Sequence, residues 1–359
     1  MTRGQTADRL LNLVMRFVGH VRGGLPITTA ASCTLFGAVS GSTQATVVAM
    51  GSPLRPRLLK AGYKDSFTIA LIVNASDIAL LIPPSIGMIV YGVVSGTSVG
   101  ELFIAGIGPG LLILVLFSVY CYFYARVRQI PPEPRSGWAE RLRAFRQALF
   151  PLGFPLIVVG GIYAGIVSPT EAAAVSVLYA LILEVLVFRE LRWRDIPELA
   201  VSTGMITAVV FILVAAGAAF SWTLSYAQIP SHLVNDVLQL DPASPTMVLI
   251  AVAIAFFIGC MFVDPIVVIL ILTPIFTPII NAAGIDPVLA GTLITLQVAI
   301  GSATPPFGCD IFTAIAVFKR PYLEVIKGSP PFFLILFLST ALLITFPQIA
   351  LFLRDVAFR

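Results

Sequence analysis

Long apolar stretches separated by short polar or basic segments dominate this chain. Apolar residues fill most of 27–60, 66–94, 106–124, 150–167, 170–188, 199–220, 246–280, 287–317 and 331–353. Spans of about 20 apolar residues are typical of transmembrane helices. The pattern therefore predicts an all-α polytopic membrane protein.

Two of these stretches are interrupted at their middle. Residues 27–60 break at Ser40-Gly41-Ser42-Thr43, and residues 246–280 break at Phe262-Val263-Asp264-Pro265. Each half of about 16 residues covers roughly 24 Å, which is short for a span. We therefore expect two re-entrant helical hairpins with their tips inside the membrane. Two short or tilted spans remain the alternative.

The stretches that follow the hairpins contain proline pairs. Pro83 and Pro84 interrupt 66–94, and Pro305 and Pro306 interrupt 287–317. A proline pair removes two backbone donors and fixes φ, so a helix cannot run through it unbroken. Broken helices at membrane depth usually build an ion or substrate site.

One sequence offset relates the two halves of the chain. The offset between the proline pairs also carries Pro56 to Pro278, Ala61 to Ala283, Gly62 to Gly284, Gly106 to Gly328 and Pro109 to Pro331. Each repeat ends with a short amphipathic piece (98–103 and 322–326) and a closing helix (106–124 and 331–353). Three crossings, within 150–220, separate the repeats. An odd number inverts the second repeat, so the pattern predicts an inverted-topology arrangement.

This pattern predicts five segments. They are an amphipathic or interfacial segment (1–26), a first repeat (27–124), an arginine-rich cytoplasmic loop (125–149), connecting scaffold helices (150–245) and a second repeat (246–359).

Composition supports a membrane protein and excludes other classes. Of 359 residues, 58% are hydrophobic and 11% are charged, against about 25% charged in soluble domains. The net charge of +4 comes from basic residues beside apolar runs, which set topology rather than bind nucleic acid. Four cysteines without metal spacing predict no transition-metal site. Two histidines, His20 and His232, lack partners at catalytic or metal spacing, so we expect no enzyme and no cofactor.

The first hairpin tip and the first proline break offer candidate ligands for a cation or a carboxylate. Broken helices leave carbonyls and amides unpaired, and these groups suit Na⁺ and anions respectively. A plain turn or tight helix packing is the alternative for these small residues. The candidates are Ser40, Gly41, Ser42, Thr43, Pro83, Pro84 and Ser85.

The second tip and break offer a carboxylate as well. Asp264 either coordinates a cation or caps the helix that starts at Pro265, and the two roles are compatible. The other candidates at the break are Thr304, Pro305, Pro306 and Gly308.

Five further polar residues are candidates for the polar lining of the substrate or ion site. Asp77 could pair with Lys64, bind a cation or face water, and Asp310 is similar. Asn74 and Gln297 could donate to substrate or bond between helices, and Ser302 could satisfy freed carbonyls.

Several motifs in order resemble one family, the large membrane subunit of tripartite ATP-independent periplasmic (TRAP) transporters. The resemblance covers nearly the whole chain. It rests on Gly19 to Leu25, Phe36 to Ser42, Ile82 to Ile86, Leu102 to Gly110, Ser168 to Ala174, Gly284 to Pro287 and Thr304 to Gly308.

The resemblance implies an elevator-type, Na⁺-coupled importer of a small organic acid, such as a dicarboxylate or another carboxylate. It implies an extracytoplasmic solute-binding protein and a small membrane subunit as partners, in the lipid bilayer of a bacterial or archaeal cytoplasmic (inner) membrane. Residues 40–43 with the first break would frame one Na⁺ site, and Asp264 with Thr304-Pro305-Pro306 a second, with substrate between the tips. A channel-like or transport-inactive subunit is the alternative.

The chain departs from the family pattern in three respects. Family members usually carry roughly two further membrane segments before the position of Met1. Asp77 stands where a small neutral residue is expected, and Gly308-Cys309-Asp310 replaces a more neutral sequence. The two aspartates are therefore expected to shift substrate or ion preference.

Overall fold

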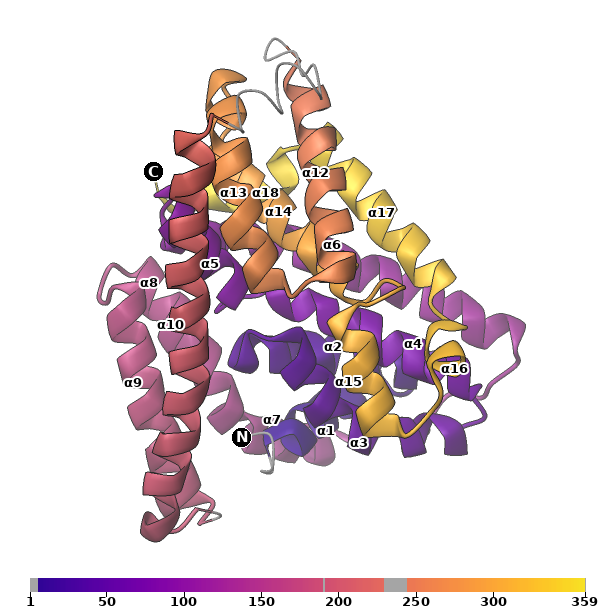
Figure 1. The fold of residues 1–359 in the computed structure, drawn as a ribbon. Coiled ribbons are helices and arrows are strands. Elements are labelled where there is room, and N and C mark those ends of the chain that lie inside the picture. Colours follow the sequence, from indigo (N-terminus) through magenta and orange to yellow (C-terminus); the bar gives the residue numbers. More distant parts are fainter. Residues whose placement is uncertain (1–5, 190, 229–243, 359) are drawn as a thin grey trace.

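The computed structural model describes residues 6–189, 191–228 and 244–358 (Figure 1). All regular secondary structure in these ranges is helical. Six described helices are long and apolar enough to cross a membrane, or seven if a bent pair near the C-terminus counts as one span. The chain is an all-α polytopic membrane protein, as the apolar pattern predicts.

The first half begins with an amphipathic helix, α1 (Thr6–Val18), which buries Leu10 and Leu11. Two helices that pack on each other follow, α2 (Gly24–Ser40) and α3 (Thr43–Lys60). The broken helix consists of α4 (Asp65–Ser76), the 3₁₀ turn η1 (Asp77–Leu80) and α5 (Ile86–Ser95). The closing helix is α6 (Val99–Val127).

Three crossings form the middle of the chain. The first comprises α7 (Trp138–Pro155), the π-helical η2 (Leu156–Gly160) and α8 (Gly161–Tyr163). The second comprises α9 (Pro169–Leu181) and the π-helical η3 (Ile182–Val187). A 3₁₀ turn, η4 (Trp193–Asp195), leads into the third crossing, α10 (Ile196–Tyr226).

The second half repeats the plan of the first. The hairpin is α12 (Pro245–Phe262) with α13 (Pro265–Ala282), and the broken helix is α14 (Pro287–Ser302) with α15 (Cys309–Phe318). Short α16 (Tyr322–Ile326), α17 (Pro330–Thr345) and α18 (Gln348–Ala357) close it. Both hairpins turn, and both broken helices are interrupted, at the positions that the sequence predicts.

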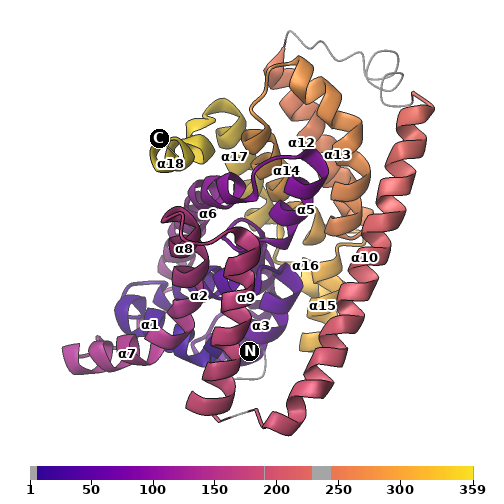
Figure 2. The same cartoon turned by 90° about the vertical axis from the view of Figure 1, so that its left-hand side faces the viewer.

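The two hairpins occupy opposite halves of the molecule. In Figures 1 and 2, α2 and α3 lie in the lower part, α12 and α13 lie in the upper part, and α10 runs along the outside. Each broken helix crosses between them, because α5 packs against α13 and α15 packs against α3. This exchange of partners is the arrangement that an inverted pair of repeats produces.

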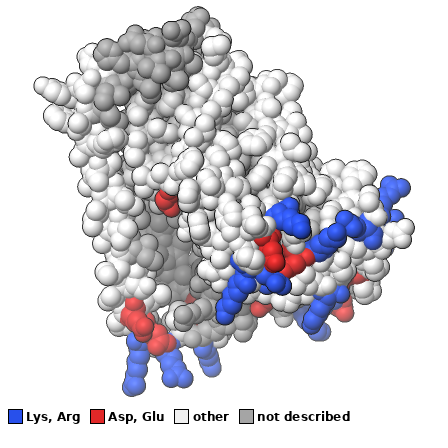
Figure 3. All heavy atoms as spheres, turned by 45° about the vertical axis from the view of Figure 1, so that its right-hand side comes forward, with Lys and Arg blue, Asp and Glu red and all other residues white. Residues whose placement is uncertain are grey.

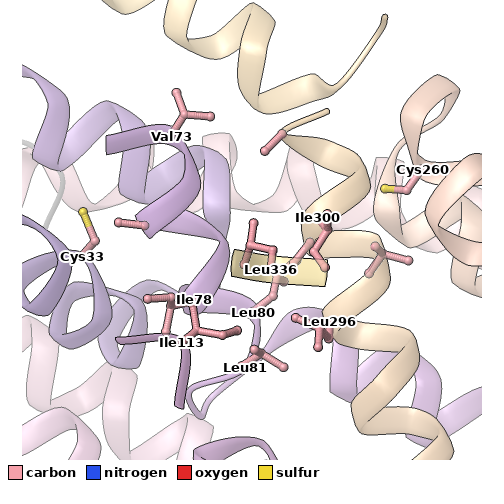
Figure 4. Close-up of a cluster of buried hydrophobic side chains, with 14 of the residues drawn as sticks. Cys33, Val73, Ile78, Leu80, Leu81, Ile113, Cys260, Leu296, Ile300 and Leu336 are labelled. Atoms are coloured by element: carbon pink, nitrogen blue, oxygen red, sulfur yellow. The ribbon is translucent and has the colours of Figure 1, made fainter. Parts of the chain in front are cut away.

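The core forms where the first break meets the second broken helix. Leu80 and Leu81 beside the first break lie near Leu296 and Ile300 of α14 and Leu336 of α17 (Figure 4), and all five are buried. A close approach of α6 completes this region. A Cβ on Gly106 would meet the carbonyl oxygen of Leu81, so only glycine fits there.

Three predicted boundaries are wrong. Residues 98–103 and 106–124 are one continuous helix, α6, because Ser98 caps it and Pro109 lies within it without ending it. The closing helix of the second repeat is not continuous, since it bends by 58° between α17 and α18, next to Pro347. The predicted arginine-rich loop is helical from Trp138, and α7 packs on α1.

Packing on α1 explains the helical part of that segment. Arg141 is buried, and its Nε donates a hydrogen bond to the carbonyl of Arg16 (3.2 Å). Its guanidinium also lies over the rings of Phe17 and Trp138. These contacts convert half of the basic segment from a solvated loop into an amphipathic helix.

Two ion-pair clusters tie down the starts of the broken helices. Asp65, the first residue of α4, accepts two hydrogen bonds from Arg55 (both 2.8 Å) and lies 3.1 Å from Arg320. Asp286, which caps α14, lies 2.6 Å from Arg354. On the face drawn in Figure 3, Lys and Arg gather toward the lower end of the molecule.

Candidate functional site

The first hairpin tip is a two-residue turn between helices. Gly41 ends α2 in the left-handed region (φ 63°), and Ser42 caps α3 by accepting a hydrogen bond from the Ala45 amide (3.4 Å). The hydroxyls of Ser40 and Thr46 lie 3.2 Å apart, and Thr46 donates to the Ser42 carbonyl (2.8 Å). Four hydroxyl and carbonyl groups therefore lie within one turn of chain.

This tip sits directly on the first proline break. The amide of Ile86 donates to the Gly41 carbonyl (3.4 Å), and a Cβ on Gly41 would collide with the carbonyl oxygen of Pro84. Buried Ser85 caps α5 by accepting from the Met88 amide (3.3 Å). The structure thus brings the predicted residues 40–43 and 83–85 into one site.

The second tip and break repeat this contact. The amide of Phe307 donates to the Met261 carbonyl (3.1 Å), which joins the second tip to the second break. Asp264 caps α13 by accepting from the Ile266 amide (2.9 Å), so the predicted capping role is present. Asp264 is only partly buried, and one of its two carboxyl oxygens makes this cap.

Residues at the second break form hydrogen bonds with the backbone groups that the end of α14 leaves unpaired. The Thr304 hydroxyl donates to the Ile300 carbonyl (2.6 Å), and the Gly308 amide donates to the Thr304 carbonyl (3.2 Å). A Cβ on Gly308 would meet the Ser302 carbonyl oxygen, so this glycine lets the chain fold back under α14. Pro305 and Pro306 lie between these contacts, at the turn itself.

One carboxyl group joins the two repeats. Asp310 is fully buried, and its two oxygens accept hydrogen bonds from Thr43 (2.8 Å) and Ser302 (2.7 Å). Thr43 begins the second arm of the first hairpin, whereas Ser302 ends the first half of the second broken helix. The first tip is therefore bonded to the second break, and Asp264 lies within electrostatic range of the same carboxyl.

Asp77 is the other buried acid of this region. It is 1% exposed, and neither carboxyl oxygen has a hydrogen-bond partner among the described residues. The predicted alternative of a pair with Lys64 is wrong, because Lys64 lies at the other end of α4 and is exposed. Asp310 acts on Asp77 electrostatically, so the two carboxyls belong to one neighbourhood.

Two predicted lining residues lie elsewhere. Asn74 donates to the Ala70 carbonyl (2.7 Å) and lies 3.5 Å from the Ser329 hydroxyl. Gln297 donates to Thr340 of α17 (2.8 Å) and lines a cavity of about 340 Å³ between α12, α14 and α17. Both amides thus form the interhelical bonds that the sequence left as their alternative role.

Sequence reasoning missed the pairing of Asp310 with Thr43 across 267 residues. The signal that was available is the eight-residue spacing from Ser302, which returns Asp310 to the end of α14 once the chain turns at the proline pair. No spacing along the sequence identifies Thr43 as its second partner, since that contact exists only when the repeats interlock.

The arrangement is suited to binding a cation. Hydroxyls, carbonyls and the Asp264 carboxyl group lie at the tips and breaks where two hairpins meet two broken helices, and such oxygen ligands suit hard cations. Within 6–189, 191–228 and 244–358, no group of three His, Cys, Asp or Glu side chains could hold a metal ion. His20 lies between α1 and α2, and His232 lies outside the described residues.

Comparisons with known proteins agree with this architecture. The family model for the DctM component of the tripartite ATP-independent periplasmic transporter matches residues 1–349. The chain is 70% identical to the ectoine TRAP transporter large permease protein TeaC of Halomonas elongata, over 100% of this chain and 84% of that protein.

Two further relatives show a high and a lower level of sequence identity to this chain. The chain is 70% identical to the ectoine/5-hydroxyectoine TRAP transporter large permease protein UehC of Ruegeria pomeroyi, over 100% of this chain and 83% of that protein. It is 38% identical to the C4-dicarboxylate TRAP transporter large permease protein DctM of Pseudomonas aeruginosa, over 99% of this chain and 83% of that protein. The chain therefore belongs to the tripartite ATP-independent periplasmic transporter family, as the DctM component or large permease.

Proposed function

We propose that this permease imports ectoine or a close zwitterionic relative, driven by Na⁺. The family consists of transporter permeases rather than enzymes, and import of a small organic acid is its general activity. The proposed delivery is by an extracytoplasmic solute-binding protein, and a small membrane subunit completes the scaffold in the cytoplasmic membrane. Both hairpin tips and both broken helices meet, and this convergence is the single observation that carries the proposal.

The charge of the site supports a zwitterion over a dicarboxylate. Asp77, Asp264 and Asp310 gather there, and no ion pair in the described part of the chain joins any of them to a basic side chain. A doubly negative solute would meet uncompensated repulsion at this depth. Ectoine carries one carboxylate and one delocalised cation, so its net charge is zero. The names of the two 70% identical relatives point to the same compound.

The geometry of the tips supports Na⁺ as the coupling ion. Cations suit the C-terminal ends of half-helices, where carbonyls are left unpaired. The α2 and α12 arms both end at a tip, beside Ser42 in the first hairpin and Asp264 in the second. Because the tips carry hydroxyl and carboxyl oxygens but no nucleotide-binding loop, an ion gradient is the proposed energy source.

An uptake experiment tests the proposal. The permease, reconstituted with its small membrane subunit and supplied with loaded binding protein, should accumulate radiolabelled ectoine when an inward Na⁺ gradient is imposed without ATP. Replacement of Na⁺ by choline should abolish accumulation, and excess succinate should compete poorly. Uptake that persists in choline would overturn Na⁺ coupling, and preferential uptake of succinate would overturn the substrate.

The alternative of a channel-like or inactive subunit makes different predictions in the same vesicles. A channel would conduct ectoine down its gradient without saturation and without binding protein. An inactive subunit would give no uptake under any gradient. Saturable uptake against a concentration gradient contradicts both.

A further inference from the structure

A buried carboxyl group without a partner lies outside the two hairpin tips. Asp77 opens the 3₁₀ turn η1, at the point where α4 ends and six residues before the first proline pair. The turn packs against α2 and α14, so Asp77 lies between the first hairpin and the second broken helix. Its side chain is 1% exposed, and both oxygens lack a hydrogen bond within the described residues.

The charges around Asp77 offer no compensation. The titratable groups that act in this neighbourhood are Asp310 and Cys309 of α15, Cys260 of α12 and Asp264 at the second tip, and none is basic. Cys33 of α2 interacts with Ser76, the neighbour of Asp77. On the other elements packed against η1, α14 has no titratable residue, and Tyr91 of α5 bonds to the Pro287 carbonyl. The charged residues of α3, α4 and α6 lie toward their ends, away from the turn.

Hydrogen bonding distinguishes the two acids. The Thr43 hydroxyl donates to one Asp310 oxygen, and the Ser302 hydroxyl lies 2.7 Å from the other oxygen and 2.7 Å from the Ala299 carbonyl, between which its one proton is shared. These hydroxyls favour an ionised carboxylate at Asp310 over one at Asp77. Asp77 receives no donor, so its ionised form would be a buried charge beside a second negative charge. Such an arrangement is costly, whereas a neutral carboxyl group costs far less. The pair can therefore hold one negative charge, and that charge belongs on Asp310.

We propose that Asp77 holds a proton in this packed state, and that it is a proton-binding site distinct from the cation ligands at the hairpin tips. This inference concerns the transport cycle and so rests on the proposed function. If Asp77 lost this proton in the packed state, an uncompensated negative charge would lie buried beside Asp310. The packed state therefore depends on the proton, and uptake depends on pH.

Infrared difference spectroscopy tests the protonation state directly, on purified permease with its small subunit. The spectrum, recorded between neutral and strongly alkaline pH, should contain the carbonyl stretch of a protonated carboxyl group. Asp77→Asn should remove that band, whereas Glu133→Gln, in an exposed loop, should leave it unchanged. Absence of the band from the wild type at neutral pH would overturn the proposal, as would its persistence in Asp77→Asn.

A second variant keeps the test decisive if Asp77→Asn does not fold. In Asp310→Asn the band should remain, because the proton lies on Asp77; its disappearance would assign the proton to Asp310 and overturn the proposal. Loss of the band when Na⁺ is added would also overturn it, because Na⁺ would then occupy the carboxyl pair.

Uptake provides the functional arm. Ectoine uptake at a fixed Na⁺ gradient should decline at alkaline pH in the wild type and become independent of pH in Asp77→Asn. An unchanged pH profile in a folded Asp77→Asn variant would contradict the role in transport. The infrared measurement needs no transport, so failure of the proposed function is distinguishable from failure of this proton site.

Discussion

At the scale of single residues, three aspartates have different surroundings although all lie near the hairpin tips or the breaks. Asp264 caps a helix and stays partly exposed, and Asp310 lies within hydrogen-bond distance of the Thr43 and Ser302 hydroxyls. Asp77 has no donor among the residues that the structure describes. The partly buried carboxyl of Asp264 is the proposed cation ligand, whereas Asp77 of the buried pair is the proposed proton site. Chemically identical side chains thus differ in their burial and in their hydrogen-bond donors, and these differences carry the separate roles proposed for them.

Asp264 provides the sharpest test of cation binding. Asp264→Asn should weaken the apparent Na⁺ affinity about tenfold or more, since losing a charged ligand at membrane depth is worth over ~1.4 kcal/mol. Asparagine caps helices nearly as well as aspartate, so folding should be preserved. A Na⁺ titration of ectoine uptake, with Glu133→Gln as control, decides the matter. An unchanged Na⁺ dependence would leave Asp264 as a cap only.

Asp65 lies outside the apolar part of the broken helix. Its interactions with Arg55 and Arg320 should contribute a stabilisation that is lost in acid. Hydrogen bonding to Arg55 and the nearby charge of Arg320 lower the pKa of Asp65 below its usual value. A lowered folded-state pKa means that the stabilisation is present above the unfolded value of about 3.9 and is lost as pH falls through the folded value.

We therefore expect Asp65→Asn to lower the free energy of unfolding by on the order of 1 kcal/mol at pH 7. The difference from wild type should disappear in strong acid. Thermal unfolding of the purified protein at both pH values measures this. A deficit that stays constant down to strong acid would show that the Asp65 carboxylate charge is not its source.

At the scale of elements, the contact between each hairpin tip and its own proline break defines the site. Gly41 makes this contact in the first repeat, since its left-handed backbone lies against the Pro84 carbonyl. A backbone hydrogen bond also joins tip and break in each repeat, from Ile86 to Gly41 in the first and from Phe307 to Met261 in the second. The two repeats therefore reach a similar arrangement through different residues.

Gly41→Ala should destabilise the protein more than Gly96→Ala does. Both glycines have left-handed backbones (φ 63° and 73°), so alanine costs on the order of 1 kcal/mol or more at either site. Only Gly41 also faces a collision with Pro84, since nothing lies within 4 Å of a Cβ on Gly96. Thermal unfolding compares them, and equal losses would mean that the tip readily moves away from the break.

At the scale of the whole molecule, the two hairpins enter from opposite halves, and the broken helices exchange partners between them. This arrangement supports alternating access by movement of the hairpins and broken helices against α7 to α10, which form the proposed scaffold. Cysteines introduced at the two tips can therefore report from which side of the membrane a water-soluble thiol reagent reaches each tip.

Cysteines at Ser42 and Val263, in a background without native cysteines, should react with small polar thiol reagents in opposite conformational states. Ser42 should be reached from the cytoplasm and Val263 from outside, because the repeats are inverted. Labelling of right-side-out and inverted vesicles, with and without Na⁺ and ectoine, measures this. Reaction of both tips from one face under all conditions would contradict inverted hairpins.

Much of the fold was predictable because its signals are local. Prolines at 83–84 and 305–306 stop a helix wherever they occur, and Gly41 and Asp264 end or cap one by their own chemistry. Boundaries failed where packing outweighed these signals: Pro109 lies inside α6, and Arg141 makes part of the basic segment helical by docking on α1. For the candidate site, the sequence similarly predicted the hairpin tips and the helix breaks. It did not predict which side chains form hydrogen bonds with one another there.

The sequence by itself determined the membrane class, the two interrupted hairpins, the two broken helices and the family, because apolar length and proline chemistry act along the chain. Only the tertiary structure decided which polar groups meet. It joined Thr43 to Asp310, turned Gln297 toward Thr340 and left Asp77 without a donor from the described part of the chain. Those contacts link residues far apart in the chain, and they form only when one inverted repeat packs into the other.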